Sequence, residues 1–178
     1  DLFGADTFNV IENEPDRLAE IKGITKAKAR KISEEFKTQF AARETLIELT
    51  SLGMTQNEAI KTYSLLKGET LDIVRSNPYM LIGNVNGITF DKADEIAANL
   101  DEPPLYDYRA QAGVVHIVRH NLSNGHTCIP RDKIFAPACD LLCCEDDYVD
   151  IALDNAIESK MLVQKEINGR EFLLLPEI

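Results

Sequence analysis

The sequence predicts a mainly α-helical protein, in which pairs of helices joined by tight glycine turns are followed by a small module of helices and a β-hairpin. Three observations support this fold class. A glycine-turn motif recurs three times, apolar residues recur at helical spacing after the turns, and two short β-prone segments flank Asn168-Gly169 near the end of the chain. We expect a first domain at residues 1–104 and a second at residues 105–178, joined near Asp101-Glu102-Pro103-Pro104.

The repeated motif is a glycine, an apolar residue and a threonine, with an alanine four residues after the threonine. The three copies begin at Gly23, Gly53 and Gly87. The first and third copies lie in a longer match, in which Asp6-Thr7-Phe8-Asn9-Val10-Ile11 parallels Glu69-Thr70-Leu71-Asp72-Ile73-Val74, and Pro15 parallels Pro78. Three copies, two of them in a shared stretch, indicate an internal repeat.

Each part of the motif has a structural role. The proline suits the first position of a short helix, and the glycine can take the positive φ angle that closes a tight turn. The threonine can cap the next helix, and the alanine lets two helices approach closely. The apolar residue, which is Ile24, Met54 or Ile88, fills the space between the helices.

Charge is distributed unevenly along the chain. The formal net charge is −11, from 19 basic and 30 acidic residues, which argues against a simple nucleic-acid binder. The window from Lys22 to Lys37 nevertheless contains six basic and two acidic residues, so it carries +4. This basic island surrounds the first copy of the motif and is either a phosphate-binding surface or a solvated helix face.

The motif resembles the helix-hairpin-helix motif, h-x-G-h-G-x-x-x-A, although threonine replaces the second glycine in all three copies. The resemblance implies that backbone N–H groups at the hairpin bind a DNA phosphate without reading bases. We expect DNA to contact the first copy, through Lys22, Gly23, Ile24, Thr25, Lys26, Ala27, Lys28 and Lys31. Weaker candidates in the other copies are Gly53, Thr55, Gly87, Thr89 and Lys92. In the alternative interpretation, all three copies are packing units of a scaffold.

The second half of the chain resembles a winged-helix domain. We expect a helix at residues 108–122, a short extended piece at 127–129, helices at about 130–143 and 147–159, and strands at 161–165 and 170–175. The helix at 147–159 takes the recognition position but is acidic, which favours packing or protein contact over DNA contact. Any DNA contact here would come from Arg119, Arg131, Lys133, Lys165 and Arg170.

The sequence offers little support for catalysis or metal binding. The four cysteines, Cys128, Cys139, Cys143 and Cys144, lack the paired C-x-x-C spacing of zinc sites, and we expect them to be buried, reduced thiols. None of the nine glycines precedes a lysine, which excludes an ATP-binding P-loop in this chain. We therefore expect no catalytic residue, no metal and no cofactor in these 178 residues.

A family resemblance extends over nearly the whole chain. The segments DTFNVIENEPDRLAEIKGIT, IVRSNPYML, NGITFDKAD and NGHTCIPR resemble the N-terminal region of RecD-like (RecD/TraA) ATP-dependent DNA helicases. The resemblance implies a tandem helix-hairpin-helix bundle and a winged-helix-like module that precede a motor. It also implies that the parent enzyme uses ATP and Mg²⁺ to unwind DNA in the 5′-to-3′ direction, in DNA repair and recombination.

These observations lead to two main hypotheses. In the first, the chain is a piece of a RecD-like helicase that binds DNA independently of sequence, and its partners are single-stranded or junction DNA and the motor domains in cis. In the second, it is a structural or protein-interaction scaffold that braces the motor. A third hypothesis is an independent nuclease or other enzyme. No apolar run is long enough to span a membrane, and we expect a cytoplasmic protein.

Overall fold

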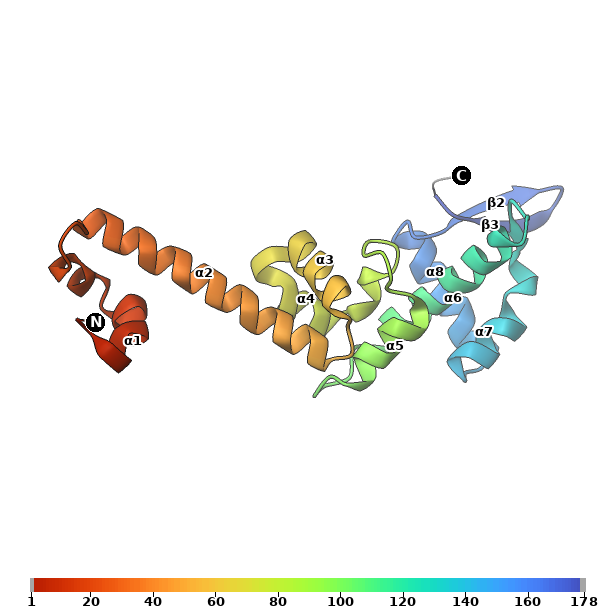
Figure 1. The fold of residues 1–178 in the computed structure, drawn as a ribbon. Helices are drawn as coiled ribbons and strands as arrows, with labels where there is room; N and C mark the ends of the chain where they lie inside the picture. Colours follow the sequence, from red (N-terminus) through yellow and green to blue (C-terminus); the bar gives the residue numbers. More distant parts are fainter. Residues whose placement is uncertain (1, 177–178) are drawn as a thin grey trace. The chain divides into compact units, whose positions relative to one another are not determined.

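The computed structural model describes residues 2–176, which form two compact units (Figure 1). The first unit extends to Ser51, and the second begins at Leu52. The first unit consists of short 3₁₀ helices η1 (Gly4–Asp6) and η2 (Pro15–Glu20), helix α1 (Thr7–Asn13) and the long helix α2 (Lys26–Ser51). Residues 104 and 105 both lie in the second unit, so the predicted domain boundary between them stays a prediction.

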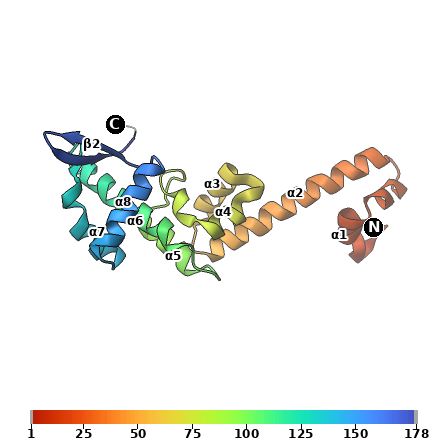
Figure 2. The same ribbon diagram turned by 180° about the vertical axis from the view of Figure 1, so that it is seen from behind.

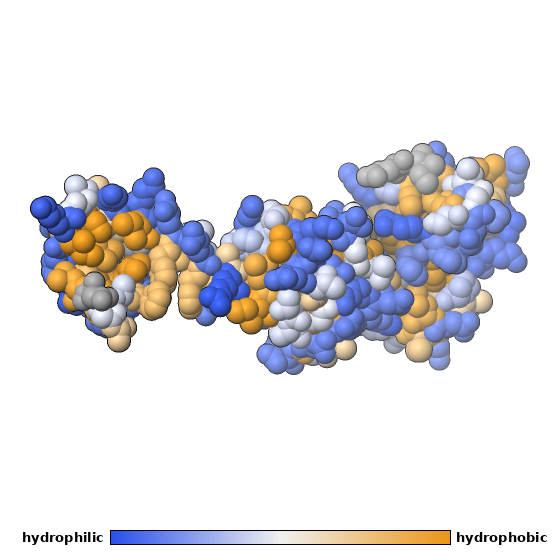
Figure 3. Space-filling model, in the orientation of Figure 1, coloured by the Kyte–Doolittle hydropathy of each residue, from blue (hydrophilic) through white to orange (hydrophobic). Residues whose placement is uncertain are grey.

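The first unit has a small core at the beginning of α2. Val10 of α1, Leu18 of η2 and Ala29 of α2 are buried there. The partly buried side chains around them are Phe3, Ile11, Ile21, Ile24 and Ile32. Ala29 is fully buried, so α1 and η2 can pack closely on the first turns of α2, as the repeat predicts. Figure 3 shows apolar side chains gathered on one face of this unit, bordered by hydrophilic ones.

The second unit begins with helices that contain the second and third copies of the motif. Their elements are α3 (Gln56–Leu66), η3 (Lys67–Glu69), α4 (Thr70–Ser76), η4 (Pro78–Leu81) and α5 (Phe90–Ala98). The alanines of both copies, Ala59 and Ala93, are fully buried, and so are Leu81, Phe90 and Ile96. Met54 and Ile88 are buried as well, whereas Ile24 of the first copy is only partly buried.

A polar network joins the third copy to the following helix, α6 (Tyr106–Ser123). The Tyr79 hydroxyl donates a hydrogen bond of 2.6 Å to Oδ1 of Asp94, and Arg109 of α6 donates two, of 2.9 and 2.8 Å, to the two carboxylate oxygens. Burial alone would raise the pKa of Asp94, but the hydrogen bonds from Arg109 and Tyr79 lower it below its ordinary value. Burial and Asp94 raise the pKa of Tyr79, which therefore stays a donor.

The rest of the second unit has the predicted order of a winged-helix-like module. After α6 come β1 (Ile129–Pro130), η5 (Arg131–Lys133), α7 (Phe135–Leu142), α8 (Asp146–Glu158), β2 (Val163–Ile167) and β3 (Arg170–Leu174). The antiparallel sheet has the order β1-β3-β2, with Ile129 opposite Leu173 and Val163 opposite Leu174. Helix α6 packs against α7 and α8, and it also contacts α5 and η4 (Figures 1 and 2).

Strands β2 and β3 are joined by the predicted two-residue turn. Asn168 and Gly169 have φ angles of 52° and 77°, as a turn with two left-handed residues requires. The mainly α fold with a small α+β module is thus confirmed. Within residues 2–176, no helix is both long and apolar enough to cross a membrane.

Candidate nucleic-acid interface

Hairpin one, residues 15–29, has the local geometry that the repeat predicts. Gly23 has a φ angle of +94°, which closes the turn between η2 and α2. Thr25 precedes α2, and its hydroxyl accepts a hydrogen bond of 3.2 Å from the N–H of Lys28. Within the described residues, the N–H groups of Thr25, Lys26 and Ala27 have no hydrogen-bond partner. These donors at the beginning of a helix suit an anion.

The surroundings of hairpin one are open and positive. Residues 22, 23 and 25–28 are all exposed, and a Cβ added at Gly23 would meet no atom within 4 Å. In the part of the chain that the structure describes, Lys22, Lys26 and Lys28 form no ion pair. Lys31, the remaining predicted site residue, lies one turn further along α2, with its Nζ 3.9 Å from the Glu35 carboxylate. The structure therefore brings Lys22 to Lys28 together at one accessible turn, and Lys31 follows one helical turn later beside Glu35.

Hairpin two, residues 52–59, differs because a carboxylate already occupies its helix start. Oε2 of Glu58 accepts a hydrogen bond of 2.8 Å from the N–H of Thr55, and the Thr55 hydroxyl accepts one from the N–H of Glu58. This reciprocal pair is a capping box, which uses donors that would otherwise face a phosphate. A second carboxylate, that of Glu95, lies only 2.8 Å from the position of a Cβ at Gly53.

Hairpin three, residues 78–93, faces hairpin two. Gly87 has a φ angle of +107°, and the Glu58 carboxylate lies 3.1 Å from the position of a Cβ there. Thr89 caps α5 by accepting from the N–H of Lys92. The Lys92 ammonium pairs with Glu95 at 3.0 Å. Glu58 of hairpin two thus lies against Gly87 of hairpin three, and Glu95 of α5 lies against Gly53 of hairpin two.

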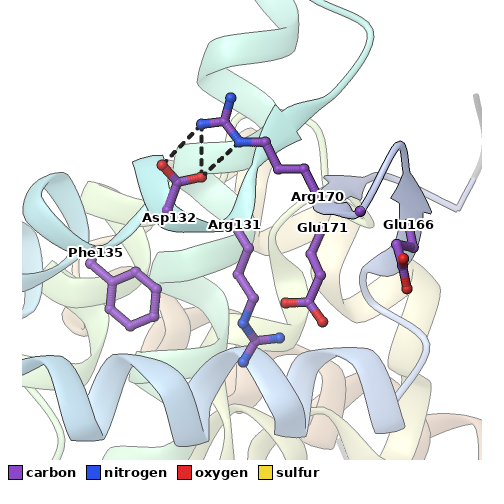
Figure 4. Close-up of a pocket in the computed structure, with 7 residues that line it drawn as sticks. Arg131, Asp132, Phe135, Glu166, Arg170 and Glu171 are labelled. Carbon is purple, nitrogen blue, oxygen red and sulfur yellow. Dashed lines mark hydrogen bonds and ion pairs between the residues drawn. The ribbon is translucent and has the colours of Figure 1, made fainter.

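Most of the arginines predicted as DNA contacts in the second half are bound to carboxylates. Arg131 donates to Asp150 at 2.7 Å and to Asp154 at 2.8 Å, so the acidic face of α8 is partly neutralised within the chain. Arg170 makes a bidentate contact with Asp132, which Figure 4 shows beside the side chain of Glu171. Arg119 is different, because no carboxylate within the described residues pairs with it.

Two comparisons show that the chain is similar to known DNA helicases. The model of the ATP-dependent RecD2 DNA helicase HHH domain matches residues 38–128, which is just over half of the chain. The chain belongs to this family. The ATP-dependent RecD2 DNA helicase of Deinococcus radiodurans is 28% identical over 136 residues, covering 74% of the chain. The matched region is 18% of that relative's length.

The matched RecD2 HHH region includes hairpins two and three and α6, and hairpin one precedes it. The assignment of phosphate binding to hairpin one therefore depends on its own geometry and charge. The resemblance to RecD-like helicases and the presence of the HHH region are confirmed by the family match. The predicted DNA-binding residues remain predictions, because neither comparison assigns a role to individual residues.

The prediction of buried cysteines is wrong. Cys143 is exposed and adopts a left-handed conformation directly after α7, and the other three cysteines are only half-buried. Burial raises the pKa of the Cys139 thiol to about 11, and its hydrogen bond to Asp146 contributes. The one-turn spacing of Cys139 and Cys143 suggested a core-facing stripe, but α7 ends at Leu142, before the stripe is complete.

Two features of the site were missed in the sequence. The T-x-x-E pattern at Thr55 to Glu58 is the signature of a capping box and could have identified the closed hairpin. The approach of Arg119 to Gly83, where its Nη1 lies 3.1 Å from the position of a Cβ, has no local sequence signal. It depends on how α6 packs against η4.

Proposed function

We propose that the chain is a DNA-binding accessory region of a longer RecD2-type helicase, and that hairpin one holds a backbone phosphate without reading bases. The relative's printed name, an ATP-dependent DNA helicase, supports the proposal that the parent enzyme is a helicase that uses ATP. We propose Mg²⁺ as the ion that accompanies ATP in that enzyme. On this proposal, the motor domains follow in the same polypeptide and the protein works in the cytoplasm, in DNA repair and recombination.

The observation that supports phosphate binding is the contrast between hairpin one and the other two. Its donors at Thr25, Lys26 and Ala27 are unpaired among the described residues, and three exposed lysines surround them. A phosphate there would accept hydrogen bonds from backbone N–H groups at the beginning of the helix. The ammonium groups of the lysines would attract it as well. The Thr25 hydroxyl accepts from the N–H of Lys28, and among the described residues the N–H groups of Thr25, Lys26 and Ala27 are left for a phosphate.

The decisive experiment is a double charge reversal, Lys26→Glu with Lys28→Glu, measured by fluorescence anisotropy on single-stranded, duplex and forked DNA at several salt concentrations. We expect affinity to fall by at least about ten-fold and the salt slope to decrease by about two, because two phosphate contacts are lost. The matched control is Lys61→Glu with Lys67→Glu, which makes the same charge change at two exposed lysines outside hairpin one.

Two outcomes would overturn this proposal. If the double reversal leaves both affinity and salt slope unchanged, hairpin one is not the contact. If the control pair weakens binding equally, the effect is one of net charge alone. Circular dichroism of all variants establishes that helix content is retained.

The alternative function, a scaffold that braces the motor, is favoured for the second unit by its internal ion pairs. Arg109, Arg131 and Arg170 all bind carboxylates of the same unit. A chain that binds no DNA at low salt, but associates with the motor domains supplied separately, would establish the scaffold role in place of the first proposal.

A further inference from the structure

A cleft in the second unit differs from the others in its charge. It has a volume of about 610 Å³ and lies between the Ile82–Thr89 segment and one face of α6. The three other described clefts all contain acidic side chains, among them Asp132, Asp94 and Glu145. This cleft is lined by no aspartate or glutamate, although the chain carries a net charge of −11.

The α6 side of the cleft is a stripe of potential hydrogen-bond donors. His116, Arg119, His120 and Ser123 recur at spacings of three and four residues, so they share one face of the helix. His116 is fixed by stacking on Phe90, with ring centroids 5.3 Å apart. Arg119 and His120 are exposed, and in the described part of the chain no carboxylate pairs with Arg119.

The opposite side of the cleft is irregular backbone. Gly83 and Gly87 both have positive φ angles, of +81° and +107°, and Asn84 and Asn86 lie between them. The N–H of Asn84 bonds to Leu81, but within the described residues those of Gly83 and Asn86 donate to no acceptor. The guanidinium Nη1 of Arg119 lies 3.1 Å from where a Cβ would stand at Gly83, so side-chain and backbone donors meet at this end.

We infer that this cleft binds a phosphate group, with Arg119 as the principal charged ligand. A guanidinium presents several N–H donors in a planar fork that matches phosphate oxygens, and imidazole N–H groups donate in either protonation state. The anion lies at the Gly83 end, because Glu58 approaches Gly87 at the other. This site is distinct from hairpin one and does not use the beginning of a helix. The phosphate belongs either to a DNA strand or to a free nucleotide.

The test uses the full chain labelled with ¹⁵N, because amide resonances report each site separately. It is titrated with a short thymidine oligonucleotide and, in a second arm, with thymidine triphosphate. We expect the amide resonances of Gly83 and Asn86 to move in at least one arm, and the arm that moves them at lower concentration identifies the source of the phosphate. If neither ligand moves them, the inference is overturned.

The same spectra separate this inference from the proposed function. If the amide resonance of Gly23 moves and that of Gly83 does not, phosphate binding at hairpin one is supported and binding in the cleft is overturned. If the resonance of Gly83 moves and that of Gly23 does not, binding in the cleft is supported and binding at hairpin one is overturned.

A variant series gives an independent readout. Arg119→Gln should weaken binding of the identified ligand about five-fold at low salt, because one charge-assisted contact is lost. Arg119→Lys should restore part of the affinity, since it keeps the charge but loses the fork. Lys61→Gln, the matched control at an exposed position of α3, should leave the affinity unchanged. Equal affinities for Arg119→Gln and the control would overturn the role of Arg119.

Discussion

Hairpin one and hairpins two and three share a motif but differ in what occupies the turn. At hairpin one, the residue three positions after the threonine is Lys28, and no side chain among residues 2–176 lies against Gly23. At hairpin two the same position is Glu58, which caps Thr55 and also lies against Gly87 of hairpin three. At hairpin three the same position is Lys92, as in hairpin one, and the carboxylate against its glycine comes from hairpin two. Closure therefore depends on the local residue in hairpin two and on packing in hairpin three, so the repeat determines the backbone conformation but not whether the turn is open.

The two regions also differ in how they are held. The third copy is joined to α6 through Tyr79, Asp94 and Arg109, all partly or fully buried. The ion pair near hairpin one, between Arg30 and Asp16, is exposed, with side chains 67% and 53% accessible. An exposed pair contributes little to stability, so we expect hairpin one to be the more easily deformed of the two.

The largest change in stability is expected from Asp94→Asn, at the partly buried network of the third copy. The substitution leaves Arg109 partly buried without its carboxylate, so we expect the free energy of unfolding to fall by about 2 kcal/mol in urea denaturation. Asp16→Asn is the matched change near hairpin one and should cost less than about 0.5 kcal/mol. Similar losses for both variants would contradict the contrast in burial.

The lowered pKa of Asp94 predicts that the stability of the fold depends on pH. The pKa of Asp94 is lower in the folded chain than its ordinary value of 3.8, so the folded state favours the ionised form. The stability it contributes is fully present above that ordinary value and is lost as pH falls through the lower, folded value. The difference in unfolding free energy between wild type and Asp94→Asn should therefore shrink in strongly acidic buffers. A difference that persists unchanged there would contradict this assignment.

Opening hairpin two should have a smaller effect. Glu58→Ala removes one half of the capping box, so we expect a loss of about 1 kcal/mol in the free energy of unfolding and faster hydrogen exchange at the Thr55 amide. Glu58→Gln keeps an acceptor for that amide and serves as the control. Unchanged exchange at Thr55 in the alanine variant would show that the capping box contributes nothing in solution.

Closing hairpin one should give the smallest change in stability and the clearest local signal. Lys28→Glu creates the T-x-x-E pattern of hairpin two, so the new carboxylate can accept from the Thr25 amide. We expect hydrogen exchange at Thr25 to slow about five-fold, as for one added hydrogen bond, while DNA affinity falls. Slower exchange at Thr25 with no loss of DNA affinity would show that phosphate binding does not require the open turn.

Much of the fold could be predicted because its signals are local. The glycine turns, the threonine caps, the buried alanines and the Asn168-Gly169 turn all depend on residues close together in sequence. The winged-helix-like order was predictable for the same reason. The length of α2, which continues to Ser51, was not predicted, because the apolar periodicity of this helix is weak over its whole length.

The sequence by itself determined the repeat, the basic island at hairpin one and the order of the helices and strands. Only the tertiary structure showed that Glu58 lies against Gly87 and Glu95 against Gly53. It also showed that Arg131 and Arg170 bind carboxylates of the same chain, and that Arg119 lies against Gly83. The physical reason is that a charged side chain can act on a ligand only where no partner from another helix already neutralises it, and packing decides which partners meet.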